Sequence, residues 1–152
     1  MADFKTLDDL PADLTGKVAL VRVDLNLPMK DGSATDVTRV EAAKPTILEL
    51  TEKGAKVLLL AHFGRPKGQR HSTMSTSFVQ GDVEKVIGKE IMFIPEVMGP
   101  VVEQSIGILR AGDIGLLDNV RFWPGEEAND PGFVKGIAAH GDFYVNDAFS
   151  AA

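Results

Sequence analysis

Residues 17–28 read KVALVRVDLNLP, an apolar run that changes to polar residues at its carboxyl end. The segment Val18–Val23 is rich in β-branched side chains, which is typical of a strand that is buried on both faces of a parallel sheet. Arg22, Asp24 and Asn26 have the same parity, so an extended chain places them on one face. Because ligands of open α/β sheets bind beyond the carboxyl ends of the strands, we expect this first strand to form the floor of a small-anion site.

The composition limits the classes of protein to which the chain can belong. Its 152 residues are enough for one domain, and the 44% apolar and 25% charged fractions are typical of a folded globular protein. The net charge of −6 argues against a general nucleic-acid or acidic-membrane surface. The chain has no cysteine for disulfides or thiol chemistry, and no apolar run near the roughly 20 residues that span a bilayer. We expect a soluble, cytoplasmic protein without a signal peptide.

Apolar runs alternate with helix-type patterns along the whole chain. Further strands are expected at 56–61, 91–94, 114–117 and 143–145, and helices near 36–53, 78–87, 101–109 and 131–139. Asp36 or Thr38 is predicted to cap the first helix, in which Pro45 predicts a kink or a fresh start. Residues 1–16 are expected to be a polar lead-in, and residues 29–35 a loop. This order predicts a three-layer α/β/α, Rossmann-like domain with a mainly parallel sheet of about five strands.

Cationic side chains are expected to gather at the carboxyl edge of this sheet. Taken alone, each has an ordinary structural explanation as a turn, paired or solvated residue. Together they lie at the starts or ends of elements that converge on one edge: Arg39, His62, Arg65 and Arg121. Arginine binds carboxylate or phosphate through two parallel hydrogen bonds, and Gly64, Gly68 and Gly125 permit close approach of a ligand to the backbone. The pattern favours a site for a small anion.

Several common site patterns are missing. The sequence contains no G-x-x-x-x-G-K-[ST] loop, and no G-x-G-x-x-G follows the first strand. The histidines at 62, 71 and 140 are scattered without metal-ligand spacing, and the last two are expected on the surface. We therefore predict neither a metal site nor a nucleotide-cofactor site in this chain.

Six blocks resemble, in the same order, the amino-terminal domain of phosphoglycerate kinase. They are VRVDLNLP at 21–28, DVTR at 36–39, AHFGRPKG at 61–68, LDNVRF at 117–122, PGEE at 124–127 and YVNDAF at 144–149. Ala61, Phe63 and Asp118 replace the family's usual serine, leucine and glutamate, and none of these changes alters the anion-binding set. The resemblance implies that residues 1–152 are the domain that binds 3-phosphoglycerate. The family's reaction is reversible phosphoryl transfer between 1,3-bisphosphoglycerate with ADP and 3-phosphoglycerate with ATP.

The resemblance also implies a role for the residues around the substrate's carboxylate. Asp24 and Asn26 match residues that hold the hydroxyl and carboxylate end of 3-phosphoglycerate. Arg22 matches a neighbouring arginine that helps to fix this network. Arg39 matches the arginine beside the carboxylate that receives the phosphoryl group, where it stabilises charge during transfer. Arg39 is therefore the implied catalytic residue.

The opposite end of the substrate is implied to lie against a phosphate clamp. His62, Arg65 and Arg121 match the groups that bind the 3-phosphate, and Gly64 lies within the same block. In the family, the chain continues past the last matching block with one more clamp arginine and a second domain that binds Mg-ATP or Mg-ADP. The resemblance thus implies a chain incomplete at its carboxyl end, with the missing domain as partner, no turnover alone and a monomeric full enzyme.

Two other functions are compatible with parts of the pattern. A stand-alone binding module would take up a small phosphorylated acid without any catalysis. An aspartyl-phosphate phosphatase would use Asp24 as nucleophile, but that chemistry needs a carboxylic acid two residues further on, and Asn26 cannot act as one.

Overall fold

The computed structural model of the chain describes residues 2–3, 13–23, 29–30, 33–61, 76–96, 99–118 and 140–147. Its elements are β1 (Ala2–Asp3), β2 (Val18–Val23), β3 (Met29–Lys30), β4 (Ser33–Ala34), α1 (Thr38–Glu52), β5 (Lys56–Leu60), the 3-10 turn η3 (Thr76–Phe78), α2 (Gln80–Ile87), β6 (Ile91–Ile94), α3 (Pro100–Ile108), β7 (Ile114–Leu117) and β8 (Phe143–Asp147).

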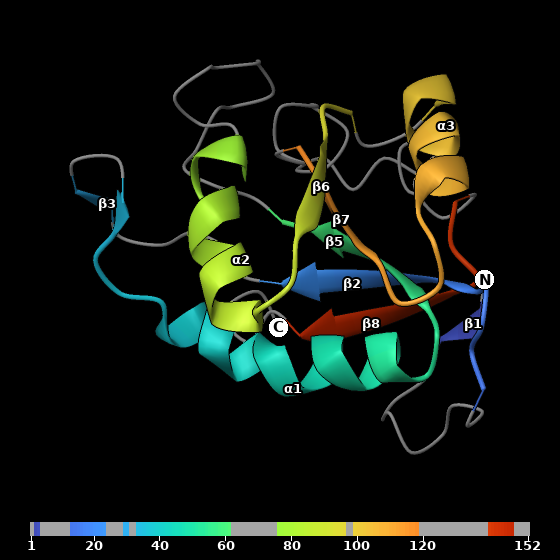
Figure 1. The fold of residues 1–152 in the computed structure, drawn as a ribbon, viewed down its shortest axis with the longest axis horizontal. Helices are drawn as coiled ribbons and strands as arrows, with labels where there is room; N and C mark the ends of the chain where they lie inside the picture. Colours follow the sequence, from blue (N-terminus) through green and yellow to red (C-terminus); the bar gives the residue numbers. More distant parts are fainter. Residues whose placement is uncertain are drawn as a thin grey trace.

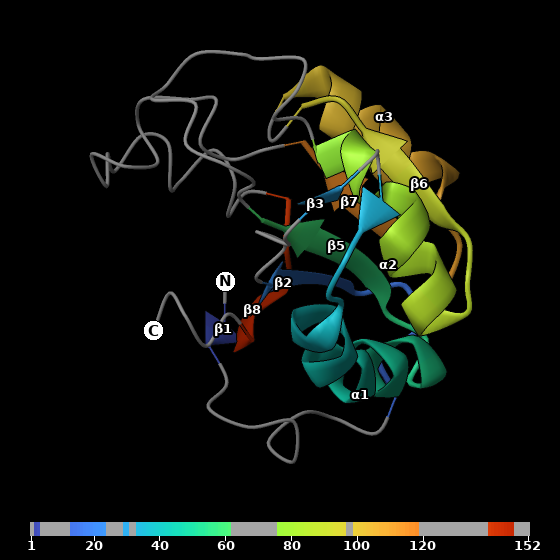
Figure 2. The same ribbon diagram turned by 90° about the vertical axis from the view of Figure 1, so that its left-hand side faces the viewer.

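Six strands form one parallel sheet in the order β1-β8-β2-β5-β7-β6. Helices α1 and α2 cover one face of this sheet and α3 covers the other, as Figure 1 and Figure 2 show together. The predicted three-layer α/β architecture is confirmed. Because the strands are parallel, their carboxyl ends lie at the same edge, which faces the viewer in Figure 2.

The central strand β2 is buried on both faces. Val21 and Val23 pack with α1 and α2 in one apolar cluster, whereas Val18 and Leu20 pack with α3 in the other. This two-sided burial is the physical reason for the nearly continuous apolar run that the sequence shows here. None of the helices in the described ranges is long and apolar enough to cross a membrane.

Of the kink or fresh start predicted at Pro45, the fresh start is wrong. Helix α1 runs through Pro45 without interruption. Pro45 is exposed, and the carbonyl that loses its partner belongs to Glu41, which is also exposed, so water can replace the missing hydrogen bond. Buried side chains on either side of the proline hold the helix against the sheet: Val40, Ala43, Ile47 and Leu50.

Helix α1 ends at Glu52, one residue before the predicted end at 53, and Gly54 closes its carboxyl end. The N–H of Gly54 donates to the Thr51 carbonyl (3.0 Å), and the N–H of Ala55 donates to the Leu50 carbonyl (3.1 Å). This paired closure needs a left-handed residue, and Gly54 has φ +91°. A Cβ at this position would also lie 2.7 Å from the Thr15 Oγ1 atom, so the close approach of the two segments requires glycine as well.

The other differences from the predicted elements are small and have physical causes. Strand β1 was not predicted, because a strand of two residues is too short to carry an apolar pattern. The loop expected at 29–35 contains the antiparallel pair β3 and β4. Strand β8 includes Asn146 and Asp147, which were expected to follow it. The helix predicted at 131–139 lies outside the described residues.

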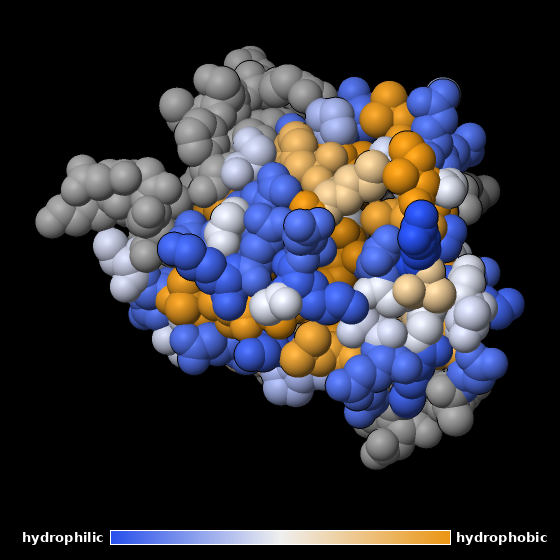
Figure 3. All heavy atoms as spheres, viewed as in Figure 1, coloured by the Kyte–Doolittle hydropathy of each residue, from blue (hydrophilic) through white to orange (hydrophobic). Residues whose placement is uncertain are grey.

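The outer edge of β6 is covered by side chains of α2. Gln80 donates its Nε2–H to the Ile91 carbonyl (2.7 Å), and Glu84 accepts the Ile91 N–H (2.8 Å). Figure 3 shows hydrophobic atoms at the surface between α2 and α3, where β6 lies and Met92 and Phe93 are half-buried. Satisfying the backbone of an edge strand in this way reduces its tendency to pair with another chain.

Gly115→Ala is expected to lower the free energy of unfolding. A Cβ on Gly115 would lie 3.0 Å from both Ile94 Cδ1 and Leu58 Cδ2, in the packed layer between β7 and α3. Forcing a methyl group into such a space costs about 1–3 kcal/mol, which urea denaturation can measure. Gly107→Ala is the matched control in α3, because nothing lies within 4 Å of its Cβ position. The control is expected to stabilise by about 0.5–1 kcal/mol, and equal effects of the two changes would contradict the packing.

Candidate functional site

The carboxyl edge of the sheet carries both predicted site residues that the structure describes. Arg22, half-buried, is the penultimate residue of β2 and lies in register with Leu60 of β5 and Asn146 of β8. Arg39, exposed, is the second residue of α1. Figure 1 shows that α1 begins at the end of the molecule toward which the β2 arrow points. Both arginines therefore belong to the same edge.

The other predicted site residues lie outside the described residues: Asp24, Asn26, His62, Gly64, Arg65 and Arg121. The points from which the chain leaves toward them are described. The last described residue before each of these segments is Val23 at the end of β2, Ala61 directly after β5, and Asp118 directly after β7. Since β5 pairs with both β2 and β7, these three points are at the carboxyl ends of neighbouring strands. The positions of the side chains beyond them remain a prediction.

The first turn of α1 is held by Asp36. Its Oδ1 accepts both the Thr38 N–H (2.9 Å) and the Thr38 Oγ1–H (2.5 Å). Val37, the N-cap residue by backbone geometry, makes no side-chain cap bond, so Asp36 satisfies one of the helix's first N–H groups. Neither of the two residues predicted to cap this helix is its N-cap residue, but they bond to each other beside it, with Thr38 as donor and Asp36 as acceptor.

The same contacts determine the charge state of Asp36. The Thr38 side-chain hydrogen bond, the Thr38 backbone hydrogen bond and, to a smaller extent, the nearby Arg39 charge lower the pKa of Asp36 below its ordinary value of 3.8. A cation in the first turn is disfavoured by the helix dipole, and the Asp36 carboxylate offsets this for Arg39. The amino end of α1 thus places an arginine beside a carboxylate that stays ionised.

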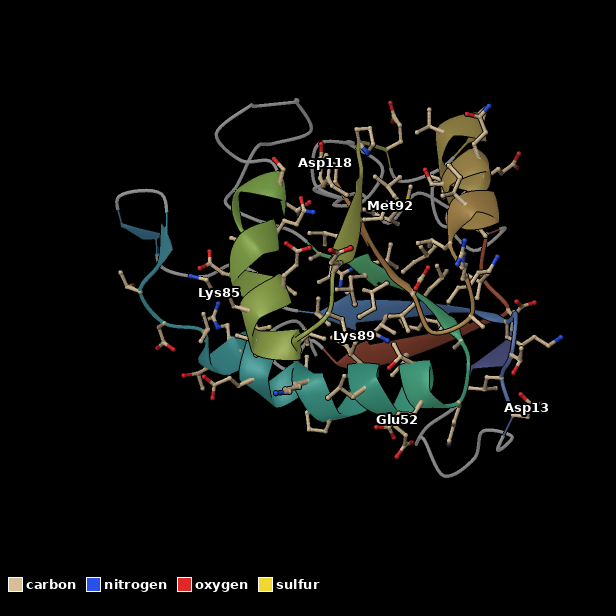
Figure 4. All side chains as sticks on the ribbon, viewed as in Figure 1. Asp13, Glu52, Lys85, Lys89, Met92 and Asp118 are labelled. Carbon is tan, nitrogen blue, oxygen red and sulfur yellow. The ribbon has the colours of Figure 1, made fainter. Side chains whose placement is uncertain are left out.

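A buried carboxylate at this edge was missed by the sequence reasoning. Asp118 is only 3% exposed, and its Oδ1 accepts the Thr76 N–H (3.2 Å). Its own N–H donates to the Ile94 carbonyl (2.9 Å), while Thr76 Oγ1 donates to the Leu117 carbonyl (2.9 Å). Figure 4 shows Asp118 near the carboxyl end of β6, far from Asp13. The only signal in the sequence was a charged residue directly after an apolar strand, which is more often a turn residue.

Two other features lie away from the predicted anion site. His140, expected on the surface, is half-buried, and its Nε2 accepts the Gly99 N–H (3.1 Å) at the start of α3. A hollow of about 210 Å³ is located at the opposite, amino edge of the sheet. It is lined by Glu90, Ile91, Met92, Leu109, Asp113 and Ile114. Its two carboxylates, without a cation among the lining residues, do not suit an anionic ligand.

Comparisons with known proteins agree on one family. A family model described as phosphoglycerate kinase matches residues 7–152. The phosphoglycerate kinases of Sphingopyxis alaskensis and Sinorhizobium medicae are 59% and 56% identical, covering 100% and 98% of this chain but 38% and 37% of their own lengths. Solved phosphoglycerate kinase structures from Pyrococcus horikoshii OT3 and Coxiella burnetii match 95% of the chain at 32% identity, with TM-scores of 0.79 and 0.80. They are covered to 36% and 35% of their lengths, so the chain spans well under half of the relatives it matches.

Thr38→Val is expected to raise the pKa of Asp36 toward its ordinary value, because the Thr38 side-chain hydrogen bond is the largest cause of the lowering. Arg39→Ala is expected to raise it less, since the guanidinium acts only through solvent-screened attraction. The measurement is an NMR titration of the aspartate carboxyl carbons. Asp13 makes the same two bonds with Thr15 and also has a lowered pKa, so it serves as an internal control that should not change.

Asp36→Asn is expected to remove part of the acid sensitivity of the fold. Because the folded-state pKa of Asp36 lies below the unfolded value, the ionised carboxylate stabilises the fold above pH 3.8, and this contribution is lost as the pH falls through the folded pKa. The difference in unfolding free energy between wild type and variant should therefore shrink from about pH 6 to about pH 2. A difference that stays constant over this range would contradict the role given to the carboxylate.

Proposed function

The chain belongs to the phosphoglycerate kinase family, and we propose that residues 1–152 form the amino-terminal, 3-phosphoglycerate-binding domain of such an enzyme. One observation supports this most directly. Strands β2, β5 and β7 immediately precede the residues that match the family's substrate blocks, and they are neighbours in the sheet with parallel carboxyl ends. Residues far apart in sequence thus start from one edge, where α/β sheets bind ligands.

In this proposal the complete enzyme transfers a phosphoryl group between 1,3-bisphosphoglycerate with ADP and 3-phosphoglycerate with ATP. The chain's own residues bind and orient the three-carbon acid. Asp24 and Asn26, assisted by Arg22, hold its hydroxyl and carboxylate end. Arg39, at the start of α1, neutralises charge that develops beside the accepting carboxylate. Phosphoryl transfer depends mainly on such positioning and charge stabilisation, since the protein contributes little covalent chemistry.

The 3-phosphate is proposed to lie against His62, Arg65 and Arg121, with the backbone at Gly64 close to it. Mg-ATP or Mg-ADP is assigned to the part of the relatives that this chain does not span, and no residue of 1–152 is given a metal or nucleotide role. Because catalysis requires both substrates in one closed site, the chain alone should bind without turnover. The complete enzyme is proposed to act in glycolysis, in the cytoplasm and as a monomer.

Arg39→Ala, Arg65→Ala and Arg121→Ala are each expected to weaken binding of 3-phosphoglycerate. Losing one charge-assisted contact costs about 1.5–3 kcal/mol, which corresponds to roughly 10- to 150-fold in Kd. Isothermal titration at low salt measures the effect. Arg110→Ala is the matched control, because Arg110 is an exposed arginine at the amino edge of the sheet and should leave the Kd unchanged.

Turnover separates this proposal from the alternative of a stand-alone binding module. A coupled assay with ATP and 3-phosphoglycerate should be silent for the chain alone and active after it is joined to the nucleotide-binding part of a relative. Binding without turnover in the joined protein would instead favour the module, and turnover by the chain alone would contradict the assignment of ATP to the missing part.

A further inference from the structure

We propose that Asp118 and Thr76 are positioning residues for the phosphate clamp. The buried pair fixes the points at which two clamp-bearing segments leave and rejoin the sheet: residues 62–75, which contain His62 and Arg65, and the segment after Asp118, which contains Arg121. This inference rests on the proposed function, because that function assigns a phosphate to these segments. It gives a role to a carboxylate that the reaction itself does not use.

The pair is buried and fully engaged. Thr76 is 0% exposed and Asp118 3%, and Asp118 is the one ionisable side chain that is buried among the described residues. A buried carboxylate is costly unless hydrogen bonds compensate its lost hydration. Here the Asp118 Oδ1 atom accepts the N–H of Thr76, which lies 42 residues earlier in the sequence. The Thr76 hydroxyl donates in turn to the Leu117 carbonyl. The two residues therefore connect η3 to the end of β7 by two separate bonds.

Asp118 also marks the last step of the ladder between β6 and β7. Its N–H donates to the Ile94 carbonyl, and its side chain accepts the Thr76 N–H. Both the main chain and the side chain of Asp118 are therefore fixed by hydrogen bonds. Arg121 is three residues further on, and a fully extended chain advances about 3.3–3.6 Å per residue. The Arg121 Cα thus stays within roughly 11 Å of a fixed anchor.

Thr76 anchors the other clamp segment. Residues 62–75 lie between two buried anchors: Ala61, which directly follows β5 and is 1% exposed, and Thr76, the first residue of η3. The segment starts after β5 and ends at Thr76, which is bonded to the end of β7. Because β5 pairs with β7, its two anchors lie at the ends of neighbouring strands. One hydrogen bond between Thr76 and Asp118 therefore ties the two clamp segments to each other. A misplacement of about 1 Å in a binding group can cost on the order of 100-fold in rate, so such a tie matters for function.

A merely structural role predicts a different outcome from a positioning role. In the first case, removal of the pair lowers the unfolding free energy but leaves the affinity of the folded chain for 3-phosphoglycerate unchanged. The structure offers two matched controls away from the clamp. Asp142 Oδ2 accepts the Val18 N–H (2.7 Å) at the amino edge, and the buried Ser105 Oγ donates to the Val101 carbonyl (2.8 Å) within α3.

The experiment compares Asp118→Ala with Asp142→Ala, and Thr76→Val with Ser105→Ala, under conditions where circular dichroism shows each variant folded. Titration with 3-phosphoglycerate should give a Kd on the order of 10-fold weaker for the first member of each pair, the equivalent of about 1.4 kcal/mol, and unchanged for the control. Thr76→Ser keeps the hydroxyl and should restore the affinity. If Asp118→Ala does not fold, the Thr76 series still decides through the second bond between η3 and the end of β7, because Thr76→Val removes the hydroxyl that donates to the Leu117 carbonyl and Thr76→Ser keeps it.

Each outcome has a distinct meaning. If the wild type binds and both Asp118→Ala and Thr76→Val bind equally well, the positioning role is wrong while the proposed function stands. If the wild type does not bind, the proposed function fails for this chain, and trypsin cleavage after Arg121 decides whether the pair holds the segment. Cleavage should be faster in Asp118→Ala than in Asp142→Ala, and equal rates overturn the inference.

Discussion

Parallel pairing of β2 with both β5 and β8 is the constraint on which the rest of the structure depends. Parallel strands cannot be joined by a tight hairpin, so each connection must return across a face of the sheet. Helices α1 and α2 return across one face and α3 across the other. Every strand of the six-stranded sheet consequently starts at the same edge and ends at the opposite one, and segments distant in sequence leave this sheet side by side.

Backbone groups and charged side chains both contribute at each edge of the sheet. At the amino edge, the Gly112 N–H donates to the Ala55 carbonyl (3.0 Å), and the Asp142 carboxylate accepts the Val18 N–H (2.7 Å). At the carboxyl edge, the Asp118 N–H donates to the Ile94 carbonyl, and the Asp118 carboxylate accepts the Thr76 N–H. The carboxyl edge differs in carrying the two predicted anion-binding residues that the structure describes, Arg22 and Arg39.

Sequence patterns predicted those parts of the fold that rest on local apolar periodicity. Strands β5, β6 and β7 follow their apolar runs within one residue, and β2 coincides with the run Val18–Val23. The shared face that parity predicts for Arg22, Asp24 and Asn26 stays a prediction, because the last two lie outside the described residues. Pro45 was misread because periodicity does not say that the proline faces solvent, where its missing N–H costs little. Asp118 could not be recognised, since its side-chain partner Thr76 lies 42 residues away in the sequence and becomes a neighbour only through the fold.

An acidic chain can hold an anion only if the carboxylates near the site are occupied. The net charge is −6, yet two of the carboxylates described at the carboxyl edge accept backbone N–H groups: Asp36 from Thr38 and Asp118 from Thr76. For Asp36 these bonds lower the pKa and so stabilise the ionised form. In both residues they direct a side-chain oxygen into the protein framework, and they thereby shape the first turn of α1 and the end of β7. The arginines that start from the same elements can then supply the local positive potential that a phosphorylated acid requires.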